Sequence, residues 1–180
     1  MVPVLGVIIG SVREGRIGPT VARWFVREAT ADGRFEVRVL DLADVDLPQD
    51  LSGVGDTDTV AKWVDECDAF VMVTPEYNHG YPASLKLALD SVKYEWRGKP
   101  VGFVSYGGLA GGVRAVEQLR LVAAELHMVS VRDAVSFVRV RKAFDADGET
   151  SDGAAVDGAA RMLEQMLWWA ARPAAAYPRS

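Results

Sequence analysis

The sequence predicts a doubly wound α/β domain of three layers, in which helices cover both faces of a five-stranded parallel sheet of order 2-1-3-4-5. Apolar runs typical of buried parallel strands alternate along the chain with segments of helical spacing, which is the pattern of βαβ crossovers. Glycine and proline gather in the loops that follow the strands. The 180 residues contain no internal repeat and no domain boundary, so we expect a single domain over residues 1–180.

The first strand and the first helix have the clearest patterns. Residues 4–9 form a continuous apolar run, as expected of a parallel strand covered on both faces. Pro19 suits the first position of the following helix, because its missing N–H would be unpaired there in any case. Asp32 and Gly33 end this helix. Its expected buried stripe consists of Val21, Trp24 and Phe25.

The following residues predict a second strand, a long loop, a short helix and a third strand. Residues 35–41 alternate only in part, which indicates a more exposed strand near an edge of the sheet. Residues 42–56 read as a long loop and residues 69–73 as a fully buried strand. The short helix at 59–66 has an apolar face of Val60, Trp63 and Val64.

The second half of the chain continues the alternation. Helical spacing is found at residues 83–92 and 113–126, and apolar runs predict strands at 100–105 and 128–131. Residues 134–140 either extend the last of these strands or add a short one.

The carboxyl-terminal part is expected to be a loop, a helix and a tail. Residues 141–157 are rich in Asp, Gly and Glu and have the composition of a mobile segment. The last helix is expected from about 158 to 171, and a tail from Ala175 onward. The side chains expected to face inward from this helix are Leu163, Met166, Leu167 and Ala170.

Composition and charge exclude several classes of protein. The net charge of −5 argues against a nucleic-acid surface, which needs a local surplus of Lys and Arg. Hydrophobic residues at 49% and charged residues at 25% are ordinary globular values, so we expect no membrane span. The apolar amino terminus has no basic leader and runs directly into Gly10 and Ser11, which indicates a strand and not a signal peptide. The expected compartment is therefore the cytoplasm.

The single cysteine gives little sign of chemistry. One cysteine cannot form an internal disulfide, and acidic neighbours are expected to raise the pKa of the Cys67 thiol, so we expect a structural role. Only His79 and His127 could join it as soft metal ligands, and their spacing matches no known metal motif. We expect no metal site.

The loop at residues 74–82 is the first candidate for a ligand site. It follows a buried strand and precedes a helix, and ligands of open α/β sheets bind at the carboxyl ends of the strands. Two prolines and two tyrosines, with Asn78, His79 and Gly80, offer flat apolar surface and backbone donors with little charge. These properties suit a planar aromatic ligand with polar edges. The alternative is a structural loop whose tyrosines only pack.

The loop at residues 10–18 is a candidate phosphate site, although it matches neither of two common motifs. It lacks the Lys and the Ser or Thr of a P-loop, and no glycine stands two positions after Gly10, so the dinucleotide fingerprint also fails. The Ser11 hydroxyl and the guanidinium groups of Arg13 and Arg16 lie next to a helix start, which favours a monophosphate. The alternative is that both arginines are solvated.

A third loop, rich in glycine, follows the predicted strand at 100–105. In a 2-1-3-4-5 sheet the carboxyl ends of strands one, three and four lie side by side, so we expect the three loops around one cleft. A ligand with a phosphate at one end and a flat heteroaromatic ring at the other is FMN. The residues expected around the cleft are Ser11, Arg13 and Arg16, then Pro75, Glu76, Tyr77 and Asn78, then Gly107, Gly108, Gly111 and Gly112.

The same three loops resemble those of the NADPH-dependent FMN reductase family. The similar stretches are Gly10-Ser11-x-Arg13-x-Gly15-Arg16, Thr74-Pro75-Glu76-Tyr77-Asn78 with the following Pro82-Ala83-x-Leu85-Lys86-x-Ala88-Leu89-Asp90, and Gly107-Gly108-x-Ala110-Gly111-Gly112-x-Arg114. The resemblance extends from Val4 to about Val131, and Pro-Glu-Tyr-Asn is its most specific part. Many members carry Ser-Asn or Ser-Ser in place of Ile17 and Gly18, and we expect Arg16 and backbone N–H groups to compensate.

The resemblance implies a flavodoxin-like fold and an FMN-dependent oxidoreductase. In such an enzyme NADPH or NADH gives hydride to bound FMN, which passes electrons to a small acceptor such as a quinone, free flavin, chromate or an azo compound. No catalytic side chain is then expected. The implied cofactor-binding residues are Ser11, Arg13, Arg16, Ile17, Gly18, Pro75, Glu76, Tyr77, Asn78, Ser105, Tyr106, Gly107, Gly108, Gly111 and Gly112.

The resemblance also implies a homodimer or homotetramer. The helix from Ser84 to Tyr94, with Trp96 after it, offers apolar surface for a second subunit. Its leucines and Val92 could instead all face the chain's own sheet. Two other functions stay open, an FMN-binding electron carrier and a redox-sensing module. Carriers tend to be more acidic, and two arginines in the phosphate loop are unusual for them, so Arg13 and Arg16 favour the enzyme.

Overall fold

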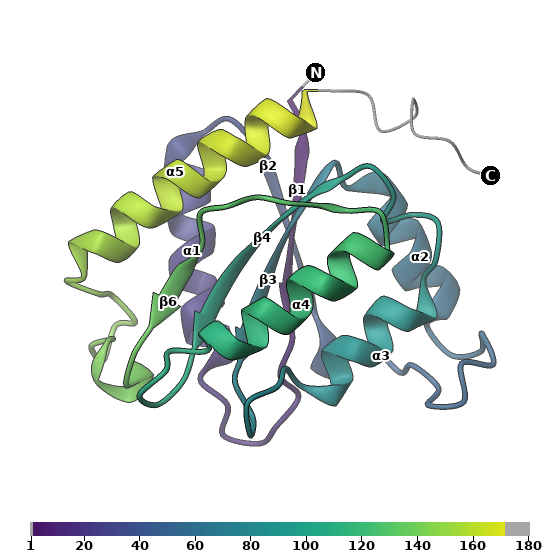
Figure 1. The fold of residues 1–180 in the computed structure, drawn as a ribbon, viewed down its shortest axis with the longest axis horizontal. Coiled ribbons are helices and arrows are strands. Elements are labelled where there is room, and N and C mark those ends of the chain that lie inside the picture. Colours follow the sequence, from purple (N-terminus) through teal and green to yellow (C-terminus); the bar gives the residue numbers. More distant parts are fainter. Residues whose placement is uncertain (1, 172–180) are drawn as a thin grey trace.

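The computed structural model describes residues 2–171, and they form the predicted three-layer α/β fold (Figure 1). Five strands lie in the order β2-β1-β3-β4-β5, and the additional strand β6 also pairs with β4. All strand pairs are parallel. The predicted strand order is therefore confirmed, and β2 lies at an edge of the sheet as expected. The predicted tail from Ala175 lies outside the described residues.

The strands begin and end close to the predicted residues. Continuous apolar runs set these limits because both faces of the central strands are covered. The strands are β1 (Val4–Ile9), β2 (Glu36–Asp41), β3 (Ala69–Pro75), β4 (Pro100–Tyr106), β5 (Val129–Ser130) and β6 (Val135–Phe137). The last two lie along the same edge of β4, so residues 134–140 contribute a short additional strand, one of the two expected alternatives.

The helices pack against the two faces of the sheet in two groups. One core cluster joins α1 and α5 to one face, and a second joins α2, α3 and α4 to the other. The helices are α1 (Gly18–Asp32), α2 (Thr57–Glu66), α3 (Ala83–Ser91), α4 (Val113–Glu125) and α5 (Gly153–Ala170), and short 3-10 helices are η1 (Leu42–Asp44) and η2 (Val140–Lys142). None of the helices within residues 2–171 has the length and apolar composition needed to cross a bilayer.

Aromatic side chains fill the centre of each cluster. The Trp24 ring meets Phe137 edge to face at 4.9 Å between centroids, and Phe70 meets Trp96 in the same way at 4.9 Å. Trp96 is only 1% exposed, because it packs beneath α3 and its indole N–H donates to the Val92 carbonyl. The expectation that Trp96 offers surface to a second subunit is therefore wrong.

The last helix starts earlier than the sequence predicted. Helix α5 begins at Gly153, because the Asp152 carboxylate accepts hydrogen bonds from the N–H groups of Ala154 and Ala155 and caps the helix. The preceding residues are also held: Arg27 of α1 donates to the Gly148 carbonyl and pairs with Glu149. Part of the segment 141–157, expected to be mobile loop, is thus helix or anchored turn.

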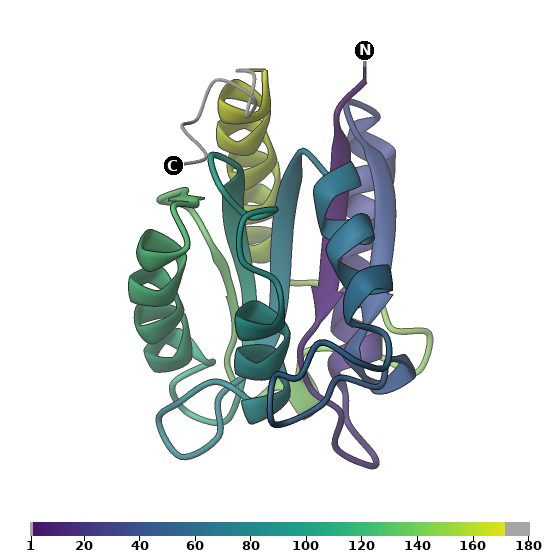
Figure 2. The ribbon, with the colours of Figure 1, turned by 90° about the vertical axis from the view of Figure 1, so that its right-hand side faces the viewer.

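The register of the sheet brings the candidate loops together. Ile9 lies opposite Val73, and Pro75 lies opposite Tyr106, so β1, β3 and β4 end at nearly the same level. Figures 1 and 2 show the loops after these strands gathered at the end of the molecule opposite the start of β1. This edge is where the sequence predicted a ligand site.

Candidate cofactor site at the carboxyl edge of the sheet

The loop after β1 is fastened to the loop after β3. The N–H of Gly10 donates to the Val73 carbonyl, and the Ser84 hydroxyl donates to the Gly10 carbonyl at 2.6 Å. The Ser11 hydroxyl lies 2.7 Å from the hydroxyl of Tyr77. Ser11 is completely buried, so its side chain holds two loops together and does not face solvent.

Arg16 is also engaged within the protein. Its guanidinium makes a two-pronged contact with the Asp41 carboxylate, at 2.5 and 2.7 Å, and donates to the Ser11 carbonyl. The hydrogen bond to Asp41 is the main reason why the pKa of Arg16 is raised. Both side chains are mostly buried. Arg16 therefore fixes the loop after β1 against the end of β2.

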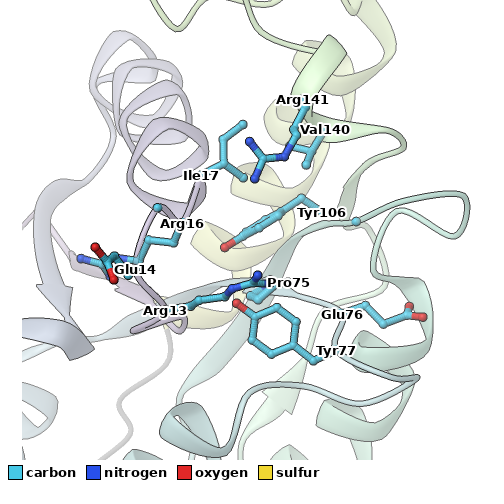
Figure 3. Close-up of a pocket in the computed structure, with 12 residues that line it drawn as sticks. Arg13, Glu14, Arg16, Ile17, Pro75, Glu76, Tyr77, Tyr106, Val140 and Arg141 are labelled. Carbon is cyan, nitrogen blue, oxygen red and sulfur yellow. The ribbon is translucent and has the colours of Figure 1, made fainter.

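A first pocket of about 210 Å³ lies between the loop after β1, the end of β3 and the start of η2 (Figure 3). Within residues 2–171, the guanidinium groups of Arg13 and Arg141 have no hydrogen-bond or ion-pair partner, and both line this pocket. Its lining is Arg13, Glu14, Gly15, Arg16, Ile17, Pro75, Glu76, Tyr77, Tyr106, Gly107, Val140 and Arg141.

Tyr106 lies at the centre of this pocket. Its side chain is only 4% exposed, and its hydroxyl oxygen has no partner among the described residues. Burial raises the pKa of Tyr106, so the phenol stays neutral and can donate a hydrogen bond. Figure 3 shows the hydroxyl pointing toward Arg16 and Ile17, at the start of α1.

The amino terminus of α1 has no side-chain cap. Ile17 occupies the cap position, where it offers no side-chain acceptor, and Pro19 follows in the first turn. The first N–H groups of a helix lack partners within the helix, and the helix dipole favours an anion there. This end of α1 and the first pocket are thus suited to a negatively charged group.

A second pocket of about 240 Å³ adjoins the first. Glu76 lines both pockets, and Gly107 of the first is followed in the chain by Gly108 of the second. The other residues around the second pocket are Asn78, His79, Leu109, Ala110, Gly111, Gly112 and Arg114. Fewer charged side chains and more glycines line the second pocket than the first.

The loop after β3 forms a tight hairpin beside the second pocket. Tyr77 and Gly80 exchange both backbone hydrogen bonds, at 2.8 and 3.0 Å, and the two residues between them have positive φ. Two successive left-handed residues are typical of a type I′ turn, for which Asn is well suited. This turn presents Asn78 and His79 (φ 50° and 73°) at the rim of the pocket.

The Glu76 carboxylate is turned away from the first pocket and toward α4. It accepts from the Arg114 side chain at 2.5 to 2.6 Å and from the Arg114 backbone N–H at 3.2 Å. Arg114 also contacts Nε2 of His79 at 3.0 Å. Figure 3 shows this outward direction of Glu76, which leaves its backbone beside both pockets.

The glycine-rich loop after β4 is shaped by close backbone approach. A side chain at Gly112 would place its Cβ 2.8 Å from the backbone nitrogen of Tyr106, and the φ of Gly112 is 90°. The Ser105 hydroxyl donates to the Gly111 carbonyl at 2.9 Å and holds this turn from inside. Only glycine fits at position 112 without displacement.

The expectation of one cleft needs correction, because the three loops surround two adjoining pockets. Arg13 borders the first, whereas Asn78 and Gly108 border the second. Of the expected binding residues, Arg13, Arg16, Ile17, Pro75, Tyr77, Tyr106 and Gly107 line the first, Asn78, Gly108, Gly111 and Gly112 the second, and Glu76 both. Ser11, Gly18 and Ser105 line neither.

The sequence reading missed Arg141 and did not assign Arg114 to the site. Arg141 stands in a basic run, Arg139-Val140-Arg141-Lys142, which could have drawn attention to it. Its position at the pocket depends on β6, which pairs with the end of β4 and carries the chain back to this edge.

Cys67 lies far below the site, in the core. It is 1% exposed, and burial is the main reason why the pKa of its thiol is raised to about 12. The expected direction of the shift is confirmed, whereas the acidic neighbours make only a small contribution. Within residues 2–171, no group of three or more His, Cys, Asp or Glu side chains could hold a metal ion.

Fold and site together define a flavodoxin-like α/β protein with an arginine-lined pocket at the carboxyl edge of its sheet. Residues 3–142 match the NADPH-dependent FMN reductase family, and the chain belongs to that family. The resemblance read from the three loops is thereby confirmed, over a longer stretch than residues 4–131.

Individual relatives agree with this assignment. An NAD(P)H-dependent FMN reductase of Schizosaccharomyces pombe is 40% identical over 137 residues, which are 70% of this chain and 68% of the relative. A quinone reductase of Escherichia coli is 30% identical over 163 residues, covering 83% of this chain and 86% of the relative.

Solved structures support the fold. The flavoenzyme NAD(P)H:(acceptor) oxidoreductase FerB of Paracoccus denitrificans superposes with a TM-score of 0.75 at 23% identity, covering 94% of this chain and 98% of FerB. Megasphaera elsdenii flavodoxin gives a TM-score of 0.59 at 13% identity, covering 89% and 98% of the two chains. The flavodoxin-like fold expected from the sequence is thus confirmed.

Proposed function

We propose that the protein is an FMN-dependent NAD(P)H oxidoreductase that passes electrons from NADPH or NADH through bound FMN to a small acceptor. The observation that carries this proposal is the pair of adjoining pockets in a chain of this family. One is lined by the Arg13 guanidinium, which has no partner within the described residues 2–171, and the other is walled by glycines. Relatives named FMN reductase and quinone reductase support the same reaction class.

The dimensions of the two pockets suit one FMN molecule better than a smaller ligand. Cofactor pockets typically enclose roughly 300–1,000 Å³, and neither the first pocket, at about 210 Å³, nor the second, at about 240 Å³, reaches that range alone. A ligand with a charged end and a flat end would use both. The phosphate belongs with Arg13 and the start of α1, and the ring belongs beside Asn78 and Gly108.

The protein's own part in the reaction is to bind and orient. FMN, when bound, supplies the hydride chemistry itself. The Glu76 carboxylate is paired with Arg114, so it serves to fix the hairpin after β3 and not as a base. In the hairpin the N–H groups of Glu76, Tyr77 and Gly80 donate to backbone carbonyls. The N–H groups at its tip, at Asn78 and His79, and those of the glycine loop are the donors that we assign to a pyrimidine edge. Tyr77, 36% exposed, borders the open side, where a nicotinamide and then an acceptor would approach.

Anaerobic reduction tests the enzymatic proposal. Purified protein with bound flavin is mixed with NADPH in the absence of oxygen, and the absorbance of oxidised flavin is followed. Rapid loss of that absorbance is expected. Unchanged absorbance would refute direct nicotinamide turnover and would leave the electron carrier or the redox-sensing module as the function.

The Arg13→Ala substitution tests the proposed phosphate contact. Loss of a charge-assisted hydrogen bond is expected to weaken FMN binding on the order of 10-fold or more, measured by quenching of flavin fluorescence. Arg23→Ala removes an arginine on the exposed face of α1, where it contacts Thr20, and is the matched control with no expected effect on FMN affinity. Equal affinity of the Arg13 variant and the wild type would contradict the proposed site.

The acceptor class belongs to the same proposal. Quinones are the first candidates because several relatives are named quinone reductases, and free flavin, chromate and azo compounds are the others. Turnover of each with NADPH and with NADH under matched conditions would rank both acceptor and donor. No turnover of any of these acceptors would contradict the reductase assignment.

We also propose a homodimer or a dimer of dimers, located in the cytoplasm. A groove of about 750 Å³ runs between α3 and the segment after β2, and it is lined by apolar side chains that include Leu42, Val45, Leu47 and Leu87. Surfaces of this kind commonly mark a contact between subunits. Size-exclusion chromatography with light scattering should give twice or four times the mass of one chain, and a monomer at micromolar concentration would refute the proposal.

A further inference from the structure

The first pocket is lined by two guanidinium groups from distant parts of the chain. Arg13 comes from the loop after β1 and Arg141 from η2, which are far apart in sequence, and both line a space of about 210 Å³. Neither guanidinium has a hydrogen-bond or ion-pair partner in the part of the chain that the structure describes. Two like charges around one small pocket repel, and an anion between them removes that repulsion.

The neutral donor in this pocket is the Tyr106 hydroxyl. Tyr106 is only 4% exposed, and its oxygen is one of the few buried side-chain atoms within residues 2–171 that have no partner. A buried hydroxyl without a partner is unfavourable, so its direction indicates where a ligand atom is expected. It lies close to the start of α1, since a Cβ built on Gly18 would be 2.7 Å from it.

Figure 3 shows how these groups are arranged. The Arg141 side chain descends from η2 toward Ile17 and Tyr106, and the Arg13 side chain extends from the other side toward Tyr106 and Pro75. The Glu14 carboxylate also belongs to the pocket lining, but it lies on the Arg16 side, away from Arg141.

The residues that the sequence first suggested for the phosphate are already engaged. The Ser11 hydroxyl is bonded to that of Tyr77, and the Arg16 guanidinium is bonded to Asp41 and to a backbone carbonyl. A phosphate at the start of α1 therefore needs other partners.

We propose that Arg141, together with Arg13 and the hydroxyl of Tyr106, binds the phosphate of FMN. The 3-10 helix η2 is then a phosphate-binding segment in addition to the loop after β1 and the end of β4. The inference rests on the proposed function. A phosphate dianion offers three oxygens, which match two guanidinium groups, one phenolic donor and the free N–H groups at the start of α1. A carboxylate has only two oxygens and would leave donors unused.

The comparison of FMN with riboflavin tests this directly, because riboflavin has the same ring and lacks the phosphate. Dissociation constants of both flavins are measured by fluorescence quenching on flavin-free wild-type protein and on the variants. The Arg141→Ala variant is expected to bind FMN on the order of 10-fold to 100-fold more weakly and riboflavin equally well. Tyr106→Phe is expected to show a smaller loss, again only for FMN.

Lys142→Ala is the matched control, because Lys142 is the neighbouring exposed cation of η2 and does not line the pocket. It is expected to bind both flavins as the wild type does. Equal weakening of FMN by Lys142→Ala and Arg141→Ala would overturn the inference, since net charge alone would explain it.

Two other outcomes would also overturn the inference, and they differ from a failure of the proposed function. Unchanged FMN affinity in Arg141→Ala would remove Arg141 from the site. Equal loss of FMN and riboflavin would show that Arg141 only supports the fold. A wild-type protein that binds neither flavin would instead refute the proposed function itself, and the inference with it.

Discussion

At the scale of single residues, the Arg16–Asp41 pair shows how a candidate ligand contact can become a structural one. The Asp41 carboxylate accepts two hydrogen bonds from Arg16 and also accepts from the Ala43 N–H at the start of η1. One carboxylate thus joins the loop after β1 to the end of β2. The hydrogen bonds between Arg16 and Asp41 are charge-assisted, and both side chains are largely buried. This contact is therefore stronger than an ordinary surface ion pair.

Asp41→Asn tests that contact. Asparagine can still cap η1, so the main change is loss of the charge facing Arg16, and we expect a destabilisation of about 1–2 kcal/mol. FMN affinity should fall as well, because the phosphate loop is no longer fixed. Urea unfolding and flavin binding measure the two effects. Asp44→Asn removes an exposed carboxylate that acts on Arg16 only through its charge and without a hydrogen bond, so both effects should be clearly smaller; equal effects at both positions would contradict the role given to Asp41.

The buried thiol of Cys67 gives a second prediction at this scale. With its pKa raised to about 12 and only 1% of the side chain exposed, Cys67 should not react with a disulfide reagent at pH 8 in the folded protein. It should react fully in urea. Prompt reaction of folded protein would show that the core around Cys67 opens readily.

The same raised pKa sets a direction for stability against pH. The folded state keeps the Cys67 proton while the unfolded state loses it above the ordinary pKa of 9.0, so this contribution to stability is lost as pH rises from 9.0 toward about 12. Cys67→Ala removes that contribution. Its free energy of unfolding should therefore fall less steeply over this range than that of the wild type, and identical slopes would contradict the assignment.

At the scale of elements, the turn between β4 and α4 depends on the backbone more than on side chains. Gly112 precedes the first residue of α4 with a φ of 90°, and the neighbouring Gly111 also has a positive φ. Ser105 and Ser136 both donate to the Gly111 carbonyl and so tie the turn to β4 and β6. The wall of the second pocket is thereby fixed to two strands of the sheet.

Gly112→Ala tests this arrangement. Its Cβ would meet the Tyr106 backbone nitrogen at 2.8 Å in a left-handed conformation, so we expect a loss of about 2 kcal/mol or more, or failure to fold. Gly108→Ala is the matched control, because a Cβ there meets nothing within 4 Å. The urea midpoint should fall for the first variant and stay near that of the wild type for the second. The reverse order would refute the description of this turn.

At the scale of the whole molecule, strong local patterns made most of the fold predictable. The apolar runs of β1, β3 and β4 and the glycines and prolines after them gave the strand order and the edge that holds the site. The start of α5 was missed because Gly153 and Gly158 look like helix breakers, whereas Asp152 caps the helix just before Gly153, and Gly158 is buried where a Cβ would meet Ala134 and Val135 only at 3.6 Å or more. Burial of the apolar face of α5 outweighs the low helix propensity of these two glycines.

The parts of the site that sequence reasoning missed depend on distant pairing. Arg16 is next to two glycines and an isoleucine in sequence, and nothing local indicates that it will reach Asp41 at the end of another strand. Arg141 lies at the pocket only because Phe137 pairs with Tyr106 and directs the chain to this edge. The division into two pockets likewise depends on side chains and loops from four separate segments, which no local pattern brings together.

The contact between the Ser11 and Tyr77 hydroxyls has a consequence for the order of binding events. It joins the loop that faces the phosphate to the loop that faces the ring, and Ser84 anchors the former to α3. Both loops are therefore ordered before the ligand binds. The protein loses little conformational entropy when flavin associates, and flavin can enter the site fast. Tyr77→Phe would remove this one link between the two loops, and slower uptake of flavin in stopped-flow mixing would be its visible sign.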